Sequence, residues 1–260
     1  MTTTIDTTLH TTLHTTIATL VDTCEQWLTP QRFKDYCPNG LQVEGVAQIS
    51  MLATAVTANQ AAIDAAIAAG AQALLVHHGL MWRGEDGTLT GFRAQRVRSA
   101  MAAGLNIVAY HLPLDAHPTL GNNVQLAARL GIANASPLGD DGVLYRGTIA
   151  LSAAELANNM GAVLARPITL IGDANKPLRR IAWCTGGGGS YFEQAIAAGV
   201  DAFITGEASE QFVHIARESG VPLLLGGHHA TERYGVQALG AALAAKLGIA
   251  TQYLEVDSPL

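Results

Sequence analysis

Short runs of β-forming residues alternate along most of this chain with alanine-rich runs, and several of the alanine-rich runs end at a glycine. The pattern predicts a strand over residues 51–57, a helix over 59–69 that ends at Gly70, and a second strand over 73–78. This order is that of a βαβ unit, and glycine is favoured just past the end of a helix. Because such alternation builds sheets covered by helices, the sequence predicts an α/β fold with mainly parallel sheets.

The same alternation predicts the other elements of the chain. Further helices are expected over residues 12–28, 92–103, 122–130, 153–165, 190–198, 208–219 and 230–246, and further strands over 106–111, 143–151, 168–172, 180–186, 201–206 and 222–227.

Two segments of the chain echo each other. Residues 65–79 and 195–207 each combine a helix, a glycine and a buried strand that ends in polar groups. The echo indicates two similar sub-domains, although such helix ends are common enough for chance to explain it. The polar stretch ASPLGDDG (135–142) is the best internal boundary. We therefore expect one α/β domain from residues 1–134 plus 226–260 and a second from 135–225.

The composition excludes several classes of protein. With 49% hydrophobic and 14% charged residues, the chain is typical of a globular protein and not of a disordered or fibrous one. Lys and Arg number 15 against 21 Asp and Glu, so no basic surface points to nucleic acid or anionic lipid. Cys24, Cys37 and Cys184 are too few and too scattered for a disulfide framework, as expected in a reducing cytosol.

No stretch of the sequence has the length and apolar character of a membrane span, and the first residues lack the basic and apolar order of a signal peptide. We therefore expect a cytoplasmic protein with no membrane partner. In the threonine-rich opening, His10 and His14 are spaced i,i+4 and could hold a metal ion. The simpler interpretation is a frayed extension before the first helix.

His77 and His78 form the strongest local signal, because they directly follow the apolar run ALLV. Adjacent strand residues point to opposite faces, but at the carboxyl end of a strand the chain turns and both imidazoles can approach one crevice. Two adjacent histidines are also hard to bury without a charge or a ligand. The pair therefore favours metal ligation.

A second signal lies in the segment HLPLDAHP, where His111 ends an apolar run and Asp115 follows four residues later. Pro113 and Pro118 argue against a helix, so we expect a rigid loop. Asp115 is a candidate ligand or simply a turn residue, and His117 is expected at the surface.

A third signal is GGHHATER, where His228 and Glu232 are spaced i,i+4 at the start of an expected helix. Residues four apart share a helical face, so one imidazole and one carboxylate can approach the same ion. The second histidine of an HExxH protease motif is absent.

Together these motifs place His77, His78, His111, Asp115, His228 and Glu232 near the ends of expected strands. Six such donors exceed the needs of one tetrahedral ion, so two ions are the better expectation. Nitrogen and oxygen ligands without sulfur suit Zn, Fe, Mn, Co or Ni and do not select one of them. The default chemistry of such a pair is hydrolysis.

A run of glycines, Gly186 to Gly189, separates an expected strand from the helix near Ser190. Its backbone N–H groups could face an anion, or the run could be a tight turn that lets strand and helix pack closely. It fits neither the P-loop nor the dinucleotide-binding pattern. Glu207 ends another strand and could face the same crevice or the solvent.

The ordered segments CPNGLQVEG, LLVHHGLMWRG, HLPLDAHPTLGNN, CTGGGGS, DAFITGEASEQ and GGHHATER closely resemble the GTP cyclohydrolase 1 type 2 homologues. That family is also known as the Nif-three-like dinuclear-metal proteins. The likeness covers nearly the whole chain after the threonine-rich start, in the short form without a mid-chain insertion.

The resemblance implies a two-domain α/β subunit of the Nif-three-like fold, with the metal-binding domain first, assembled into a homohexamer. It implies two divalent metal ions per subunit, held by His77, His78, Asp115, His228 and Glu232, with the carboxylates as bridges. His111 matches a histidine that lines the same site, where a proton-transfer role is expected. His229 stands where relatives have an aromatic residue.

The family name suggests opening of the guanine ring of GTP, but no motif in the sequence indicates recognition of guanine. Arg83, Arg93, Arg96 and Arg98 could line a substrate channel or form a solvated helix face. We therefore expect a metal-dependent hydrolase that acts on a small nucleotide-like or anionic substrate. The alternatives are a non-enzymatic metal-handling protein and a scaffold or adaptor.

Overall fold

The structure is a computed structural model that describes residues 15–260. His10 and His14 lie outside the described residues, as does the start of the expected helix 12–28. The described part of that helix, α1, spans Ile17–Leu28. The Thr16 hydroxyl accepts a hydrogen bond from the Thr19 backbone N–H, which otherwise has no partner in the first helical turn.

Five strands form the first sheet, in the order β13-β4-β5-β6-β2. Four of them run parallel, and only β2 is antiparallel to its neighbour. The expected strands 51–57 and 73–78 are confirmed residue for residue. The strands are β2 (Gly40–Val43), β4 (Met51–Thr57), β5 (Ala73–His78), β6 (Asn106–Ala109) and β13 (Ala250–Tyr253).

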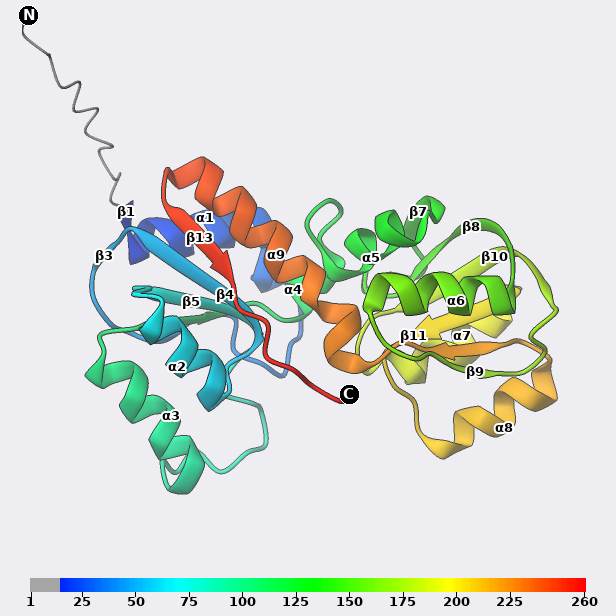
Figure 1. Ribbon diagram of the computed structural model, residues 1–260, viewed down its shortest axis with the longest axis horizontal. Coiled ribbons are helices and arrows are strands. Elements are labelled where there is room, and N and C mark those ends of the chain that lie inside the picture. The colour runs from blue at the N-terminus through cyan, green and yellow to red at the C-terminus, as the bar shows by residue number, and fades with distance from the viewer. Residues whose placement is uncertain (1–14) are drawn as a thin grey trace, which may run out of the picture.

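Helices cover both faces of this sheet (Figure 1). On one face α1 and α9 (His228–Leu247) pack through side chains such as Leu20 and Leu239 against Leu75 of β5. On the other face α2 (Gln60–Ala68) packs through Ile63, and α3 (Gly91–Ala102) through Ala100. A short antiparallel pair, β1 (Thr15–Thr16) and β3 (Gln48–Ile49), lies beside α1.

Six strands form the second sheet, in the order β7-β8-β10-β11-β12-β9. Only β10, β11 and β12 run parallel to one another. The expectation of mainly parallel sheets therefore holds for the first sheet but not for the second. The strands are β7 (Ala133–Pro137), β8 (Tyr145–Ser152), β9 (Thr169–Ile171), β10 (Pro177–Cys184), β11 (Ala202–Thr205) and β12 (Leu223–Leu225).

The antiparallel pairing of β7 with β8 follows from their connection, because residues 138–144 are too few for the crossover that a parallel pair needs. Helices again cover both faces (Figure 1). The helices α5 (Asn122–Leu130) and α6 (Ala153–Leu164) cover one face, and α7 (Phe192–Ala197) and α8 (Glu210–Ser219) cover the other. A short helical turn, η2 (Gly188–Tyr191), leads into α7.

The α/β fold expected from the sequence is thus confirmed. The expected domain boundary between residues 134 and 135 falls inside β7, and α5 packs in the core of the second sheet. The division of the chain into domains stays a prediction. Among residues 15–260, no helix combines the length and the apolar character needed to cross a membrane.

The segment after His111 is a helix rather than the expected loop, so that expectation is wrong. The short helix α4 spans Leu112–Ala116, with Pro113 in its first turn. Proline is tolerated there because the N–H groups of the first turn have no intrahelical partner in any case. Another short turn, η1 (Pro30–Arg32), packs against α4.

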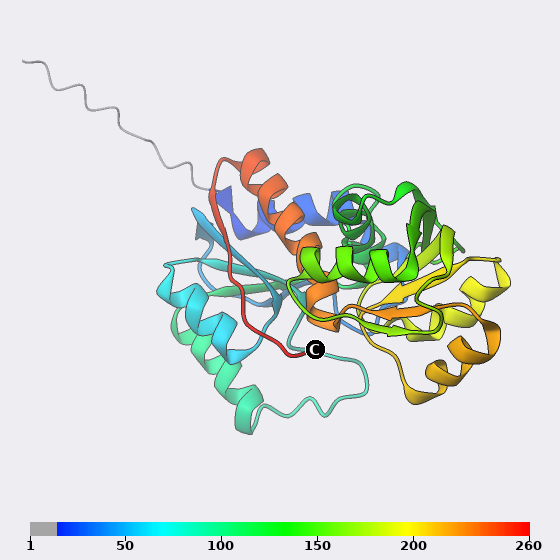
Figure 2. The same cartoon turned by 45° about the vertical axis from the view of Figure 1, so that its right-hand side comes forward.

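The helix α9 connects the two halves of the molecule. Its first turn follows β12 of the second sheet, and its later turns pack on the first sheet, as the turned view also shows (Figure 2). The final segment of the described chain returns to the start of α9, where the His229 N–H donates to the Leu260 carbonyl oxygen. The start of α9 therefore lies between the two sheets.

Candidate metal centre

Four histidines and two carboxylates gather at the carboxyl ends of the first sheet's strands. His77 and His78 end β5, while His111 and Asp115 lie just after β6. His228 and Glu232 come from the first turns of α9. Their donor atoms form three overlapping groups that could hold a metal ion: His77 with His78 and His111, His78 with His228 and Glu232, and His77 with Asp115 and Glu232.

Glu232 lies at the middle of this donor cluster. Its Oε1 is 3.5 Å from His77 Nε2, and that nitrogen is also 3.5 Å from Asp115 Oδ1. Its Oε2 is 3.1 Å from both His78 Nε2 and His228 Nε2. The two oxygens of one carboxylate therefore face two different groups of donors.

Each histidine of the cluster has a partner for its Nδ1 atom outside the cluster. The Nδ1–H of His77 donates to the Tyr110 carbonyl oxygen at 3.1 Å, and that of His228 donates to Glu207 Oε1 at 3.1 Å. His78 Nδ1 lies 3.1 Å from the Thr57 hydroxyl.

His111 follows the same pattern, since its Nδ1–H donates to Asp35 Oδ1 at 2.8 Å. Partners of this kind fix the orientation of imidazoles that bind metal ions. The Nε2 atoms are therefore the nitrogens left to face the cluster.

Two buried atoms of the cluster, His77 Nε2 and Glu232 Oε2, lie 3.1–3.5 Å from ionisable partners but make no well-aligned hydrogen bond among the described residues. The residues His77 and Glu232 are 0% and 3% exposed. Burying a polar atom without a well-aligned hydrogen bond costs about 1–3 kcal/mol. A cation bound between them would satisfy both atoms, so the residues present fit a metal ion.

The two buried carboxylates, Asp115 and Glu232, differ in the direction of their pKa shifts. Burial raises the pKa of Asp115, and the negative charge of Glu232 adds to this effect. Burial alone would also raise the pKa of Glu232, but the neighbouring imidazoles hold it well below its usual value. Glu232 is therefore the more acidic of the two carboxylates in the metal-free protein.

The histidines of the cluster also differ in the direction of their pKa shifts. Burial disfavours the charged form of His77 and of His228, but the adjacent carboxylates outweigh it and raise the pKa of each to about 9. Burial lowers the pKa of His78 to about 4. Near neutral pH the metal-free cluster therefore holds protons on His77 and His228 but not on His78.

Asparagines that the motif analysis did not single out orient Asp115. The side-chain amide of Asn122 donates to Asp115 Oδ1 at 2.9 Å, and its Oδ1 accepts from the Gly235 N–H of α9. The amide of Asn123 donates to the Asp115 carbonyl oxygen at 3.3 Å and accepts from the Thr185 N–H. The start of α5 therefore ties α4 to α9 and to the end of β10.

The glycine run Gly186–Gly189 packs closely against the donor cluster. Gly186 has φ +63°, and its carbonyl oxygen accepts from the N–H groups of Gly206 and Glu207. A Cβ atom at Gly186 would overlap Glu232 Oε1, and one at Gly188 would lie 2.5 Å from Cys184 Cβ. These contacts favour the tight-turn interpretation of the run over an anion cradle.

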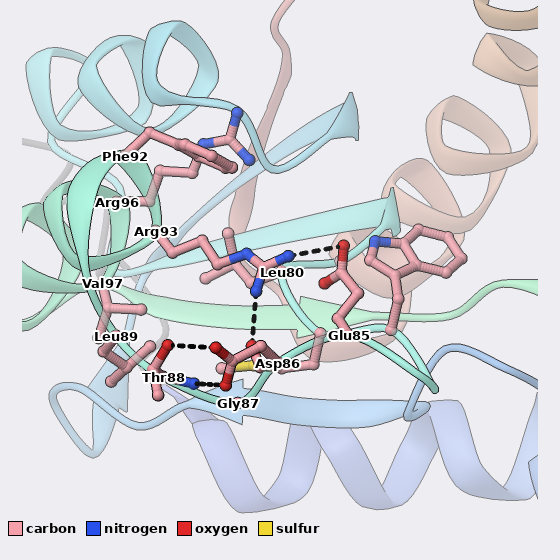
Figure 3. A pocket seen from close by; sticks show the side chains of 13 residues that line it. Leu80, Glu85, Asp86, Gly87, Thr88, Leu89, Phe92, Arg93, Arg96 and Val97 are labelled. Atoms are coloured by element: carbon pink, nitrogen blue, oxygen red, sulfur yellow. Dashed lines mark hydrogen bonds and ion pairs between the residues drawn. The ribbon is translucent and has the colours of Figure 1, made fainter.

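A cavity of about 260 Å³ lies next to the cluster, between residues 79–89 and α3 (Figure 3). One of its lining residues, Trp82, also lies against the cluster, with ring centroids 5.3 Å from His111 and 5.8 Å from His78. Of the four arginines named from the sequence, Arg93 and Arg96 line the cavity, whereas Arg83 and Arg98 do not. Arg93 is paired with Glu85 at 3.0 Å.

Other histidines lie outside the cluster. His117 accepts hydrogen bonds from backbone N–H groups of its own turn, the nearest from Leu120 at 3.0 Å. His229 pairs with Glu255 at 2.7 Å. Neither belongs to the three donor groups.

The protein has two β-sheets, each covered by helices, and a buried cluster of histidines and carboxylates beside the helix that joins them. It is therefore an α/β protein with a candidate metal centre. Residues 15–258 match the family Duf34/NIF3 (NGG1p interacting factor 3), and the chain belongs to that family.

Its relatives include proteins named GTP cyclohydrolase 1 type 2 homolog. The one from Pseudomonas aeruginosa is 47% identical, with 92% of this chain and 96% of the relative covered. The one from Escherichia coli is 44% identical, with 89% and 94% covered.

Solved structures share the fold. The protein ybgI, described as of unknown function, is 41% identical and superposes with a TM-score of 0.90 over 95% of this chain and 100% of that one. TTHA1606 from Thermus thermophilus is 31% identical, with a TM-score of 0.88 over 95% and 100%. The Nif-three-like fold expected from the sequence is confirmed.

Proposed function

We propose that this protein binds two divalent metal ions and acts as a metal-dependent hydrolase on a small nucleotide-like or anionic substrate. The observation that carries the proposal is the position of Glu232, whose two oxygens face separate donor groups. One ion would be held by His77, Asp115 and Glu232, and the other by His78, His228 and Glu232. A carboxylate shared in this way is usual in two-metal hydrolytic sites.

The bound pair would supply Lewis acidity and a nucleophile at neutral pH. The chain's own groups would do the rest. Glu207 and the Tyr110 carbonyl oxygen hold the rings of His228 and His77 in place. His111 is the imidazole at the cluster that remains for proton transfer, because it belongs to neither proposed ligand set. The name shared by the relatives supports a nucleotide-like substrate.

A test of this function combines elemental analysis of the purified protein with a screen of nucleotides and phosphorylated metabolites. We expect two equivalents of metal per chain and metal-dependent turnover of at least one compound. Two tightly held equivalents without any turnover would contradict the hydrolase. Rapid metal exchange without turnover would instead favour the alternative of a metal-handling protein.

Loading the cluster with zinc should release protons and should bind more tightly as the pH rises. Ligand imidazoles must be neutral, while His77 and His228 carry protons below their pKa of about 9. We expect about two protons released per chain near neutral pH and fewer as the pH approaches 9. Titration calorimetry in buffers of different ionisation enthalpy measures this number.

The metal-free protein should show the opposite trend in stability. A histidine whose pKa is raised on folding stabilises the fold fully below its ordinary value of 6.5, and the stabilisation is lost as the pH rises through about 9. Between these values the melting temperature should fall without zinc, whereas the stabilisation by added zinc should grow. Equal pH dependence with and without zinc would contradict the assignment of these two ligands.

We further propose that the protein works in the cytoplasm as a homohexamer, as the family resemblance implies. Leu89, Phe92 and Met101 support a subunit interface, because each is more than half exposed on α3 or the loop before it. Light scattering after size exclusion should give six chains per particle. A monomer would contradict this assembly.

A further inference from the structure

Asp35 is a buried carboxylate beside the cluster that none of the sequence motifs singled out. Its side chain is 4% exposed. Its Oδ1 accepts from His111 Nδ1 at 2.8 Å and from the N–H groups of Tyr36 at 2.7 Å and Cys37 at 3.1 Å. Only N–H donors surround this oxygen, so they hold the carboxylate in a single orientation.

The other oxygen of Asp35 is held in the same way. Its Oδ2 accepts from the side-chain amide of Asn39 and from the Leu112 N–H, both at 3.0 Å. Asn39 in turn accepts from the His111 N–H at 2.8 Å. The loop 35–39 therefore forms hydrogen bonds with both the backbone and the ring of His111.

The ring of His111 is also confined by aromatic neighbours. The centroid of Tyr36 lies 5.0 Å away and that of Trp82 lies 5.3 Å away, and both meet the ring edge to face. Because Nδ1 is bound to Asp35, the nitrogen left to face the donor groups of His77 and His78 is Nε2. The rings of the proposed ligands His77 and His78 also lie against His111, with centroids 4.9 and 5.8 Å away. The hydrogen bonds that hold the Asp35 carboxylate on His111 come from none of the proposed ligands.

We infer that Asp35 is a positioning residue that keeps the Nδ1–H of His111 on its carboxylate and turns the Nε2 lone pair towards the donor cluster. The catalytic role of this Nε2 atom rests on the proposed function. In hydrolysis Nε2 takes the proton that the attacking water loses as its oxygen bonds to the substrate, and returns it to the leaving atom as the old bond breaks. An ionised partner on Nδ1 sets the tautomer that this transfer needs.

The test is nitrogen-15 NMR of the histidine rings in the full-length, zinc-loaded protein, which shows the ring nitrogen that carries hydrogen. In the wild type we expect His111 with hydrogen on Nδ1 only. In Asp35→Asn, the new amide N–H groups oppose the surrounding donors, and we expect a mixture of both tautomers. Zinc content should stay at the wild-type value. In the matched control Glu207→Gln, the signals of His228 should change and those of His111 should not.

A folded Asp35→Asn protein whose His111 keeps hydrogen on Nδ1 alone would overturn the inference. A wild-type spectrum with hydrogen on Nε2 would overturn it as well, even if the variant fails to fold. With a substrate from the screen above, Asp35→Asn should lower kcat about 10²-fold or more and leave KM unchanged. If the wild type turns over nothing, the proposed hydrolase fails while the ring spectra still decide the role of Asp35.

Discussion

Replacing Glu232 with alanine is expected to abolish binding of both metal ions. Its two oxygens lie 3.1–3.5 Å from the Nε2 atoms of His77, His78 and His228, so it pairs with three of the four histidines of the cluster. Elemental analysis should fall from two equivalents per chain in the wild type to less than one. Zinc at about 100 times its Kd should stabilise the wild type by about 2.7 kcal/mol for each ion bound and leave the variant unchanged.

Glu255→Ala is the matched control for this variant. Glu255 is also a carboxylate paired with a histidine of α9, His229, but neither residue belongs to the donor cluster. We expect full metal content and full stabilisation by zinc in this control. Two equivalents of metal in Glu232→Ala would contradict the bridging role of Glu232.

The sequence was sufficient to predict β5 and most of α9, which carry four of the six donors, but not α4, which carries Asp115. Strands β4 and β5 are continuous apolar runs and helix α5 ends at Gly131, so their bounds are readable from local pattern. Strands β2 and β13 were missed for a physical reason. Strand β13 is an edge strand of the first sheet with mostly exposed side chains, and β2 is a short antiparallel addition to the opposite edge. Neither needs an apolar run.

The convergence of the six donors was also predictable, because parallel strands bring their carboxyl ends to one edge of a sheet. The residues that hold these donors were not. Asp35 contacts His111 from 76 positions away, and Asn122 contacts Gly235 from 113 positions away. Such contacts depend on how the segments pack, and no spacing along the chain encodes them.

The glycine run shows how a motif can be noticed while its role stays open. Consecutive glycines are compatible with an anion cradle and with a tight turn, and only the neighbours across the fold separate the two. The neighbour of Gly186 is Glu232 Oε1, and that of Gly188 is Cys184. The absence of side chains in this run therefore leaves the space that the side chains of the donor cluster occupy.

Gly186→Ala should accordingly destroy the metal centre without removing any ligand. The new methyl group would overlap Glu232 Oε1 and lie 3.0 Å from His228 Nε2, and the backbone has φ +63°. Overpacking costs about 1–3 kcal/mol and a positive φ about 1–2 kcal/mol more for a residue with a Cβ. We expect a loss of about 2–5 kcal/mol in unfolding free energy, together with less than one equivalent of metal.

Gly187→Ala separates this explanation from a general intolerance of the loop to side chains. Its Cβ would meet His228 Cε1 at 3.6 Å and Glu207 Oε1 at 3.8 Å, which are ordinary contacts, and its φ is −81°. We expect wild-type stability and two equivalents of metal, measured by denaturant unfolding and elemental analysis. An anion cradle formed by the backbone would predict no such contrast between neighbouring glycines, because a methyl group at either position would approach the anion. Equal metal content in the two variants would therefore contradict the role of Gly186 as the space into which Glu232 packs.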